Sequence, residues 1–204
     1  VFSVYKRRSS ASLPGRGIDL KQEAKDQVAA GYCCYSSATT LHYTMGHGVH
    51  SFVLHPVALQ YFLQPAIRIV LPDNASTIYC DRRMLLTGGG ESTLSDALQR
   101  CLDKFRGSTF TSGCLVGDLH MLLQTGGLLV TESAHLLCEA APVAFVIEQA
   151  GGVALDHTGR RILELAVEED HNVQVSLVVG SRLAITHLQL GTGTGNGHPK
   201  LQVE

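Results

Sequence analysis

The stretch EAAPVAFVIEQAGGVALDHTGRRILEL, residues 139–165, decides the fold class because its pattern changes from helical to extended within a few residues. Pro142 stands where the first turn of a helix tolerates proline, and Gly151 and Gly152 follow the apolar run. The residues after these glycines predict two strands around a turn at 156–159. A helix that leads directly into strands is typical of a layered α/β domain.

The neighbouring segments repeat this alternation of helix and strand. VQVSLVVGS, residues 173–181, is a nearly continuous β-branched run, as expected of a strand buried on both faces. LLVTE, residues 128–132, predicts a short strand. Residues 93–105 and 113–127 each carry an apolar stripe with helical spacing and end at glycine, so both predict helices.

The N-terminal third is less decisive. Residues 1–8, VFSVYKRR, already predict a strand, and a domain rarely begins in mid-strand, so we expect an upstream segment. Residues 28–45 are small and apolar, and their periodicity is compatible with either helix or strand. Residues 47–56 predict a strand that stops at Pro56. At the other end, the glycine-rich residues 190–204 predict a flexible tail.

Composition limits the class of protein. The chain has 204 residues, is 45% hydrophobic and 17% charged, and carries a net charge of −2, which suits one domain with a substantial core. This balance predicts neither nucleic-acid binding nor membrane insertion, and the basic run Lys6-Arg7-Arg8 is expected to be a solvated strand end. Six scattered cysteines without a C-x-x-C pair predict reduced thiols in a soluble, intracellular protein.

Three patterns that suggest a site have simpler explanations. The alternating glycines of 191–197 lack the following helix that a phosphate loop requires. His47, His50 and His55 have no carboxylate or thiolate at ligand spacing, so we expect turn and edge histidines. Asp118 and His120 lie two positions apart on a predicted helix, where side chains diverge by about 200°, so a structural role is expected.

Glu139 leaves two interpretations open. A single carboxylate at a helix start caps that helix or complements its dipole. Spacing alone favours the cap.

Five segments resemble the fructose-1,6-bisphosphatase family, in matching order and spacing over residues 1 to about 185. GYCCYSSATTL…GVHSFVLHP is similar to the family pattern GYALYGSATML…GVxxFxLDP, and CEAAPVAFVIEQAGG is similar to YECNPMAYVMEKAGG. VFSVYKRRS, SGCLVGDLHMLL and ILELAVEEDHNVQVSLVVGS match three further family segments. The resemblance implies the family's C-terminal sugar-binding domain over residues 1–189, an α/β fold with a mixed sheet flanked by helices.

The resemblance also implies a site. Such enzymes remove the 1-phosphate of a sugar bisphosphate with Mg²⁺ ions, most of whose ligands belong to an acidic motif that precedes the strand matched by residues 1–8. That motif is absent from residues 1–204, so no cofactor is expected in this chain unless a missing segment completes a Mg²⁺ site. By position, Glu139 falls on a family metal ligand, and Gly113, Cys114 and Leu115 fall on the turn that approaches the sugar.

Most of the family's phosphate contacts are replaced. The arginine and tyrosine before the sugar-binding turn become Phe110 and Thr111, another tyrosine becomes Thr131, and a lysine falls near Ser133. A loosely aligned asparagine falls near Arg82. Each lost charge-assisted hydrogen bond to a phosphate dianion removes about 1.5–3 kcal/mol.

The sequence therefore predicts, first, a catalytically degenerate relative that serves as a structural or regulatory subunit, with protein partners and weak or no sugar-phosphate binding. The alternative is a Mg²⁺-dependent sugar-bisphosphate phosphatase whose metal-binding half is missing from this chain. A sugar-phosphate sensor is a third, weaker hypothesis. The compartment is expected to be cytoplasm or plastid stroma, and the sequence does not decide between them.

Overall fold

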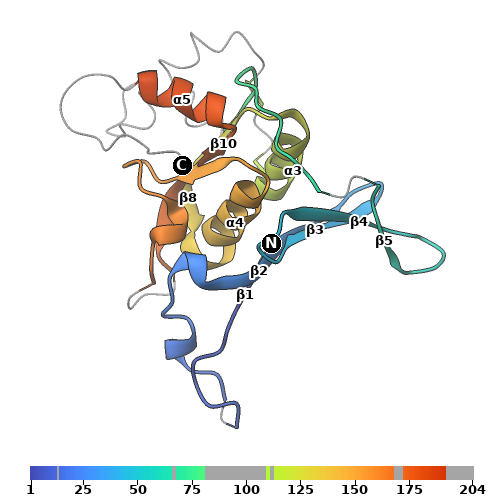
Figure 1. The fold of residues 1–204 in the computed structure, drawn as a ribbon, viewed down its shortest axis with the longest axis vertical. Helices are drawn as coiled ribbons and strands as arrows, with labels where there is room; N and C mark the ends of the chain where they lie inside the picture. The colour runs from blue at the N-terminus through green and yellow to red at the C-terminus, as the bar shows by residue number, and fades with distance from the viewer. Residues whose placement is uncertain (13, 66–67, 81–108, 111–112, 168–171, 192–204) are drawn as a thin grey trace.

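The structure is a computed structural model that describes residues 1–12, 14–65, 68–80, 109–110, 113–167 and 172–191. Helices α3 (Leu115–Thr125) and α4 (Ala141–Gln149) lie between two β-sheets (Figure 1). Helix α5 (Arg182–Gly191) packs on the opposite face of the second sheet. The described chain is thus layered as sheet, helices, sheet and helix.

The first sheet contains five antiparallel strands in chain order: β1 (Phe2–Tyr5), β2 (Gln27–Tyr35), β3 (Thr39–Thr44), β4 (Val49–Leu54) and β5 (Tyr61–Leu63). Residues 28–45, for which the sequence left helix and strand open, form β2, β3 and their connecting turn. Ala30 and Tyr32 are fully buried, whereas Tyr35 is 82% exposed. Tyr35 lies on the face of β2 opposite to Ala30 and Tyr32, so only one face of this strand is covered, and a run of small apolar residues forms a strand here.

The second sheet has the order β7-β6-β8-β10-β9. Its strands are β6 (Ile78–Cys80), β7 (Thr109–Phe110), β8 (Leu128–His135), β9 (Val153–Leu155) and β10 (Gln174–Gly180). Strand β6 runs parallel to β7 and β8, whereas β10 runs antiparallel to β8 and β9. The predicted α/β fold with a mixed sheet flanked by helices is confirmed.

Strand β10 is covered on both faces, as its sequence predicted. Leu177 and Val179 belong to the cluster beneath α3 and α4, while Val178 belongs to the cluster beneath α5. Because strand side chains alternate, two separate cores use successive residues of one strand.

Two of the predicted helices are confirmed. Helix α4 has Pro142 in its first turn and is preceded by a short π-helix, η3 (Leu136–Ala140). Helix α3 ends at Gly126, which takes a positive φ of 72°, as does Gly127 at 105°. Only glycine adopts such backbone angles without strain, so this pair ends α3 and turns the chain directly into β8.

One expectation for residues 153–165 is wrong. The first half forms β9, but the second half is a 3₁₀-helix, η4 (Ile162–Glu164), and only an isolated bridge joins Leu155 to Arg161. Ile162 and Leu163 are both buried. A short helical turn directs these adjacent side chains toward the core, which a strand with one covered face does not do.

Two sequence predictions fall on residues that are not described. The predicted helix at 93–105 lies outside the described part of the chain. Helix α5 extends to Gly191, and residues 192–204 are not described, so the division into 1–189 and a tail at 190–204 stays a prediction. No helix among the described residues is long and apolar enough to cross a membrane.

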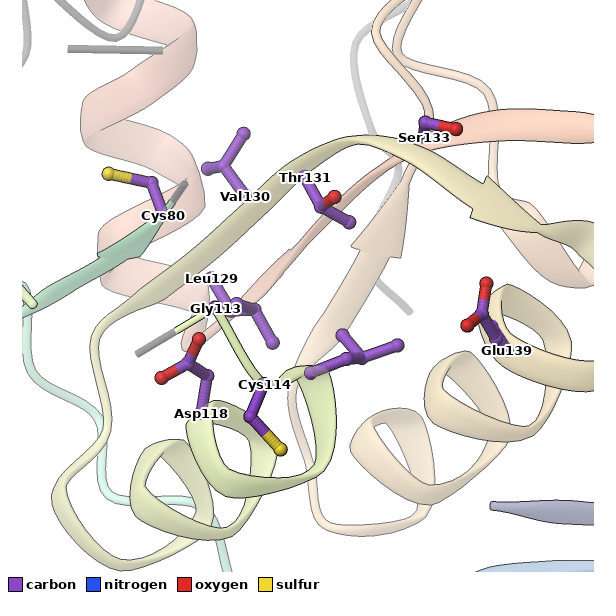
Figure 2. Close-up of a pocket in the computed structure, with 10 residues that line it drawn as sticks. Cys80, Gly113, Cys114, Asp118, Leu129, Val130, Thr131, Ser133 and Glu139 are labelled. Carbon is purple, nitrogen blue, oxygen red and sulfur yellow. The ribbon is translucent and has the colours of Figure 1, made fainter. Parts of the chain in front are cut away.

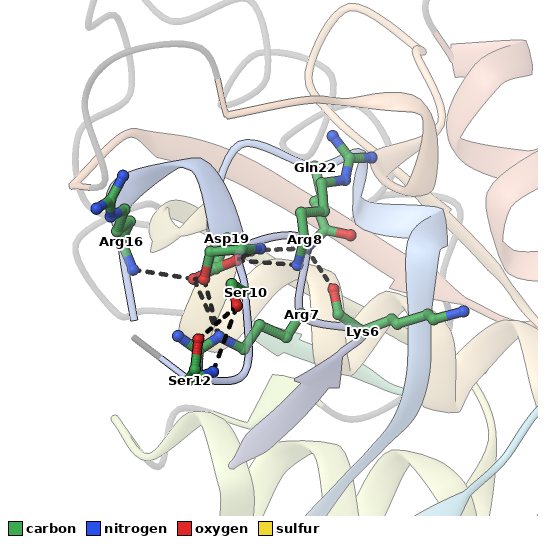
Figure 3. A network of polar contacts seen from close by, with 9 residues as sticks. Lys6, Arg7, Arg8, Ser10, Ser12, Arg16, Asp19 and Gln22 are labelled. Atoms are coloured by element: carbon green, nitrogen blue, oxygen red, sulfur yellow. Dashed lines mark hydrogen bonds and ion pairs between the residues drawn. The ribbon is translucent and has the colours of Figure 1, made fainter. Parts of the chain in front are cut away.

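The basic run Lys6-Arg7-Arg8 is exposed directly after β1, as expected of a solvated strand end, and it also belongs to a folded loop. The Asp19 carboxylate, in the 3₁₀-helix η1 (Gly17–Asp19), accepts hydrogen bonds from the backbone N–H groups of Arg8, Ser9 and Arg16 (Figure 3). These bonds, led by that from Arg16, lower the pKa of Asp19. The Arg8 guanidinium donates to the Asp26 carboxylate in η2 (Ala24–Asp26) at 3.2 Å. The loop is therefore held by its own acidic side chains.

Candidate functional site

Residues that the sequence assigned to a substrate and metal site converge on one pocket, here called the α3 pocket (Figure 2). It encloses about 150 Å³. Its described lining comprises Cys80, Gly113, Cys114, Leu115, Asp118, Leu129, Val130, Thr131, Ser133 and Glu139. The predicted sugar-binding turn and the predicted metal ligand thus face the same space, although at least 24 residues separate them in sequence.

The turn before α3 forms one wall of the pocket. Gly113 has a φ of 70°, and Cys114 is the residue at which α3 starts. The Asp118 N–H donates to the Cys114 carbonyl at 2.9 Å, which closes the first helical turn. The N–H groups of Leu115, Val116 and Gly117, which precede Asp118 in this turn, have no acceptor within the helix. Because the Asp118 carboxylate of the same turn already borders the pocket, the wall suits a hydroxyl oxygen.

Glu139 forms the opposite wall, in η3. Its Oε2 accepts a hydrogen bond of 2.7 Å from the His135 N–H at the start of η3. Glu139 therefore caps η3, whereas the sequence led us to expect a cap on the helix that contains Pro142, α4. The assignment of Glu139 as a metal ligand stays a prediction. The hydrogen bond from His135 occupies only one of its two carboxylate oxygens.

Strand β8 supplies the hydroxyl groups of the pocket. Thr131 is half-buried, and Ser133 donates through Oγ to the Gln174 side chain of β10 at 2.7 Å. Of the other positions that the resemblance assigns to phosphate contacts, Phe110 ends β7, while Thr111 and Arg82 lie outside the described residues. None of the described residues that line the α3 pocket is lysine or arginine.

Sequence reasoning missed Asp118 as a lining residue. Its side chain is 7% exposed and borders the pocket, whereas His120 contacts Tyr32 of β2 on another side of α3. The predicted divergence of Asp118 and His120 is thus observed. The available signal was the four-residue spacing from Cys114, which places both side chains on one helix face.

The described residues do not by themselves fit a Mg²⁺ centre. Within the described ranges, no three His, Cys, Asp or Glu side chains lie close enough together to hold a metal ion. Figure 2 shows Asp118 and Glu139 well apart on opposite sides of the pocket. A Mg²⁺ site needs several oxygen ligands in near-octahedral geometry.

The histidines at 47, 50 and 55 do not provide a metal site among the described residues either. His50 lies on β4, and His55 lies beyond the end of that strand. The His55 Nδ1 accepts hydrogen bonds from the Val57 and Ala58 N–H groups at 3.2 and 3.1 Å. His55 therefore stabilises the turn between β4 and β5, in agreement with the predicted turn role.

Two family models match the chain. Residues 1–65 match "Fructose-1-6-bisphosphatase, N-terminal domain", and residues 92–190 match "Fructose-1-6-bisphosphatase, C-terminal domain". The first match covers the five strands of the first sheet, which end at Leu63. The second match covers α3, α4, all but the last residue of α5, and most strands of the second sheet.

Similar proteins carry the same family name. A class 1 fructose-1,6-bisphosphatase of Crocosphaera subtropica is 34% identical in an alignment of 194 residues that covers 89% of this chain and 52% of that protein. One of Maridesulfovibrio salexigens is 34% identical in an alignment of 198 residues that covers 89% of this chain and 57% of that protein. The chain therefore spans about half the length of these curated relatives.

Solved structures agree. The fructose-1,6-bisphosphatase of Leishmania major in its T-state has a TM-score of 0.75 and 28% identity, over 85% of this chain and 56% of that one. Its holo form has a TM-score of 0.74 and 30% identity, over 84% and 54%.

Proposed function

Because the chain belongs to the fructose-1,6-bisphosphatase family, we propose that the α3 pocket is the sugar-binding side of a Mg²⁺-dependent sugar-bisphosphate phosphatase site. One observation carries the proposal: the Gly113–Leu115 turn and Glu139, assigned independently by position, line the same pocket. The phosphatase names of the relatives support this interpretation over the catalytically degenerate subunit that the sequence predicted first.

In this proposal the chain binds and orients the sugar. The first turn of α3 offers N–H groups to a sugar hydroxyl oxygen, and the Thr131 hydroxyl offers a further donor or acceptor. Mg²⁺, where present, would polarise the phosphoryl group and activate a water molecule. Glu139 is the one described residue assigned to that metal, so the remaining acidic ligands would come from outside the described residues.

The test is phosphate release from fructose 1,6-bisphosphate in the presence of Mg²⁺, measured on the native polypeptide with everything that co-purifies with it. We expect turnover within the ordinary enzyme range of about 1–10³ s⁻¹. Glu139→Gln should lower kcat by about 10²-fold or more, because the variant loses the anionic ligand.

Glu132→Gln is the matched control for Glu139→Gln. Glu132 is exposed on β8 and is not part of the pocket lining, so the same change of charge should leave kcat unchanged. Phosphate release no faster than in buffer, from an intact and folded preparation, would eliminate the phosphatase proposal.

A second candidate function is the structural or regulatory subunit, and the exposed face of the first sheet favours it. Helices α3 and α4 cover one face of this sheet. The other face, here called the outer face, carries Phe2, Val4, Tyr35, Tyr61 and Leu63, which are 39–82% exposed. Tyr43 and Phe52 stack on the same face with ring centroids 5.5 Å apart. Contiguous exposed apolar side chains mark surfaces that bind another protein.

The subunit proposal predicts weak ligand binding. If the family's phosphate-binding side chains are replaced, fructose 1,6-bisphosphate should bind with a Kd in the millimolar range or weaker. This corresponds to a binding free energy of about −4 kcal/mol or less favourable. Isothermal titration calorimetry measures this directly. A micromolar Kd would contradict the proposal of a subunit that no longer binds sugar bisphosphate, and it would favour the phosphatase proposal.

A further inference from the structure

Two histidines face each other between the first sheet and helix α3. His42 of β3 is 5% exposed, and its ring stacks on Tyr32 of β2 with centroids 4.7 Å apart and 15° between planes. His120 of α3 meets the His42 ring edge-on, with centroids 5.1 Å apart. The pair therefore lies where sheet and helix contact each other.

The hydrogen bonds of His120, as the Gln124 amide is oriented, fit a neutral ring. Gln124 Nε2 donates to His120 Nε2 at 2.8 Å, so this nitrogen carries no proton. The proton then lies on Nδ1, which is 3.2 Å from the Tyr32 hydroxyl oxygen and donates to it. Protonation at Nε2 would set two donors against each other and break the Gln124 bond.

His42 has no such partners. Both of its ring nitrogens are buried, and neither forms a hydrogen bond with any described residue. A charged imidazolium at this position would lack both water and a hydrogen-bond acceptor, which is costly. The closed packing therefore favours the neutral ring.

The surroundings of the pair contain no compensating negative charge among the described residues. Tyr32 and Cys34 of β2 and His120 of α3 are the titratable groups that face His42, and β4 contributes the uncharged Ser51 opposite it. Burial raises the pKa of Tyr32, which keeps its hydroxyl neutral. None of the ion pairs in the described part involves either histidine.

We infer that His42 and His120 form a pH-sensitive latch that favours the packing of helix α3 on the first sheet at neutral pH and weakens this packing under mildly acidic conditions. Because α3 starts at the Gly113–Leu115 turn, more frequent opening of this helix would also disturb the wall of the α3 pocket. The latch does not depend on whether the pocket hydrolyses a phosphate ester.

The direction of the pH effect follows from proton linkage. Burial, and to a lesser extent the neighbouring His120, lowers the pKa of His42 to about 4, and burial also lowers the pKa of His120. In an open state, where the rings meet water, the pKa of a histidine is about 6.5. The open state therefore binds more protons than the closed state between pH 6.5 and about 4. Closed packing is fully favoured above pH 6.5 and is weakened as the pH falls through this window.

These values set the size of the effect. Between pH 7 and pH 5, His42 alone should raise the open-to-closed ratio by about 20-fold, and His120 adds to this. The experiment is hydrogen–deuterium exchange of α3 amides in the full chain, analysed by mass spectrometry and corrected for the intrinsic pH dependence of exchange. We expect α3 opening to increase by at least about 20-fold over this range.

The variant His42→Phe keeps an aromatic ring on Tyr32 and removes the titratable group. Replacing an unsatisfied polar ring with an apolar one of similar shape is nearly neutral for stability. This variant should show a much flatter pH dependence of α3 opening. The control His50→Phe changes a half-exposed histidine on β4 that is not in the pair, and it should behave like the parent chain.

Two results would overturn the latch. One is an equal pH dependence of α3 opening in the parent and in His42→Phe. The other needs no variant: an NMR titration of the parent chain in which the His42 ring titrates with a pKa of 6 or above. This second measurement decides the question even where His42→Phe fails to fold.

Discussion

At the residue scale, Gly127 has a specific structural requirement. It links α3 to β8 with a φ of 105°, and a Cβ built there would overlap the Thr77 carbonyl oxygen next to β6. The Leu128 N–H donates to the same carbonyl at 2.9 Å. The close approach of the two strands therefore depends on the absence of a side chain.

We expect Gly127→Ala to lower the free energy of unfolding by about 2–5 kcal/mol, from backbone strain together with overpacking. Gly159→Ala is the matched control. Gly159 has a similar φ of 85°, but a Cβ there meets nothing within 4 Å, so only about 1–2 kcal/mol of backbone strain applies. Denaturant unfolding of both variants separates the cost of backbone strain from the cost of steric overlap. Equal losses of unfolding free energy in the two variants would contradict the close-approach explanation.

At the element scale, helix α3 connects the core with the pocket. Leu119, Leu122 and Leu123 are at most 4% exposed and face the cluster that both sheets share, whereas Met121 is 45% exposed. The start of the helix forms a wall of the α3 pocket, and its middle carries His120 against the first sheet. The position of this one helix thus depends on packing along its entire length.

Leu122→Ala should therefore lower the free energy of unfolding by about 2–5 kcal/mol, because a fully buried leucine leaves a cavity. The adjacent Met121→Ala should change it by no more than about 0.5–1 kcal/mol, since that side chain is exposed. Urea unfolding followed by circular dichroism provides the comparison. A similar loss in both variants would show that the burial pattern of α3 is misassigned.

At the scale of the whole molecule, the layers leave one face of the first sheet uncovered by the described helices. Both faces of the second sheet are covered, by α3 and α4 on one side and by α5 on the other. The outer face of the first sheet instead exposes aromatic and aliphatic side chains on β1, β2 and β5. Isolated in water, such a face is expected to bury itself against a second surface.

We expect the purified chain to self-associate in the micromolar range, as measured by sedimentation velocity. The double variant Tyr61→Lys with Leu63→Lys places two charges on the edge strand β5 and should shift the distribution toward monomer. Lysine substitutions at the exposed residues Leu20 and Ile18, which lie in the loop after β1, control for added charge and should have little effect. A parent chain that remains monomeric at high micromolar concentration would argue against an interface on the outer face.

Much of the fold was predictable because its signals are local. The apolar stripe of residues 113–127 and the Pro142–Gly151 spacing predicted α3 and α4, and the β-branched run at 173–181 predicted a strand buried on two sides. The sequence of residues 28–45 did not distinguish helix from strand, because small apolar residues fit both the helical and the strand period. Burial of one face of these strands by the helix layer decides it. The helical turn η4 was missed because burial of adjacent residues depends on what packs above them.

The amino-acid sequence by itself determined the family and the mixed α/β architecture, because residue identity and period are carried by short segments. Only the tertiary structure decided that Glu139 caps η3, that Asp118 lines the pocket and that His42 lies buried against His120. Each of these facts depends on which distant segment occupies the space beside a side chain. No local periodicity of the sequence encodes which distant segment lies beside a given side chain, since this is set by the packing of helices between two sheets.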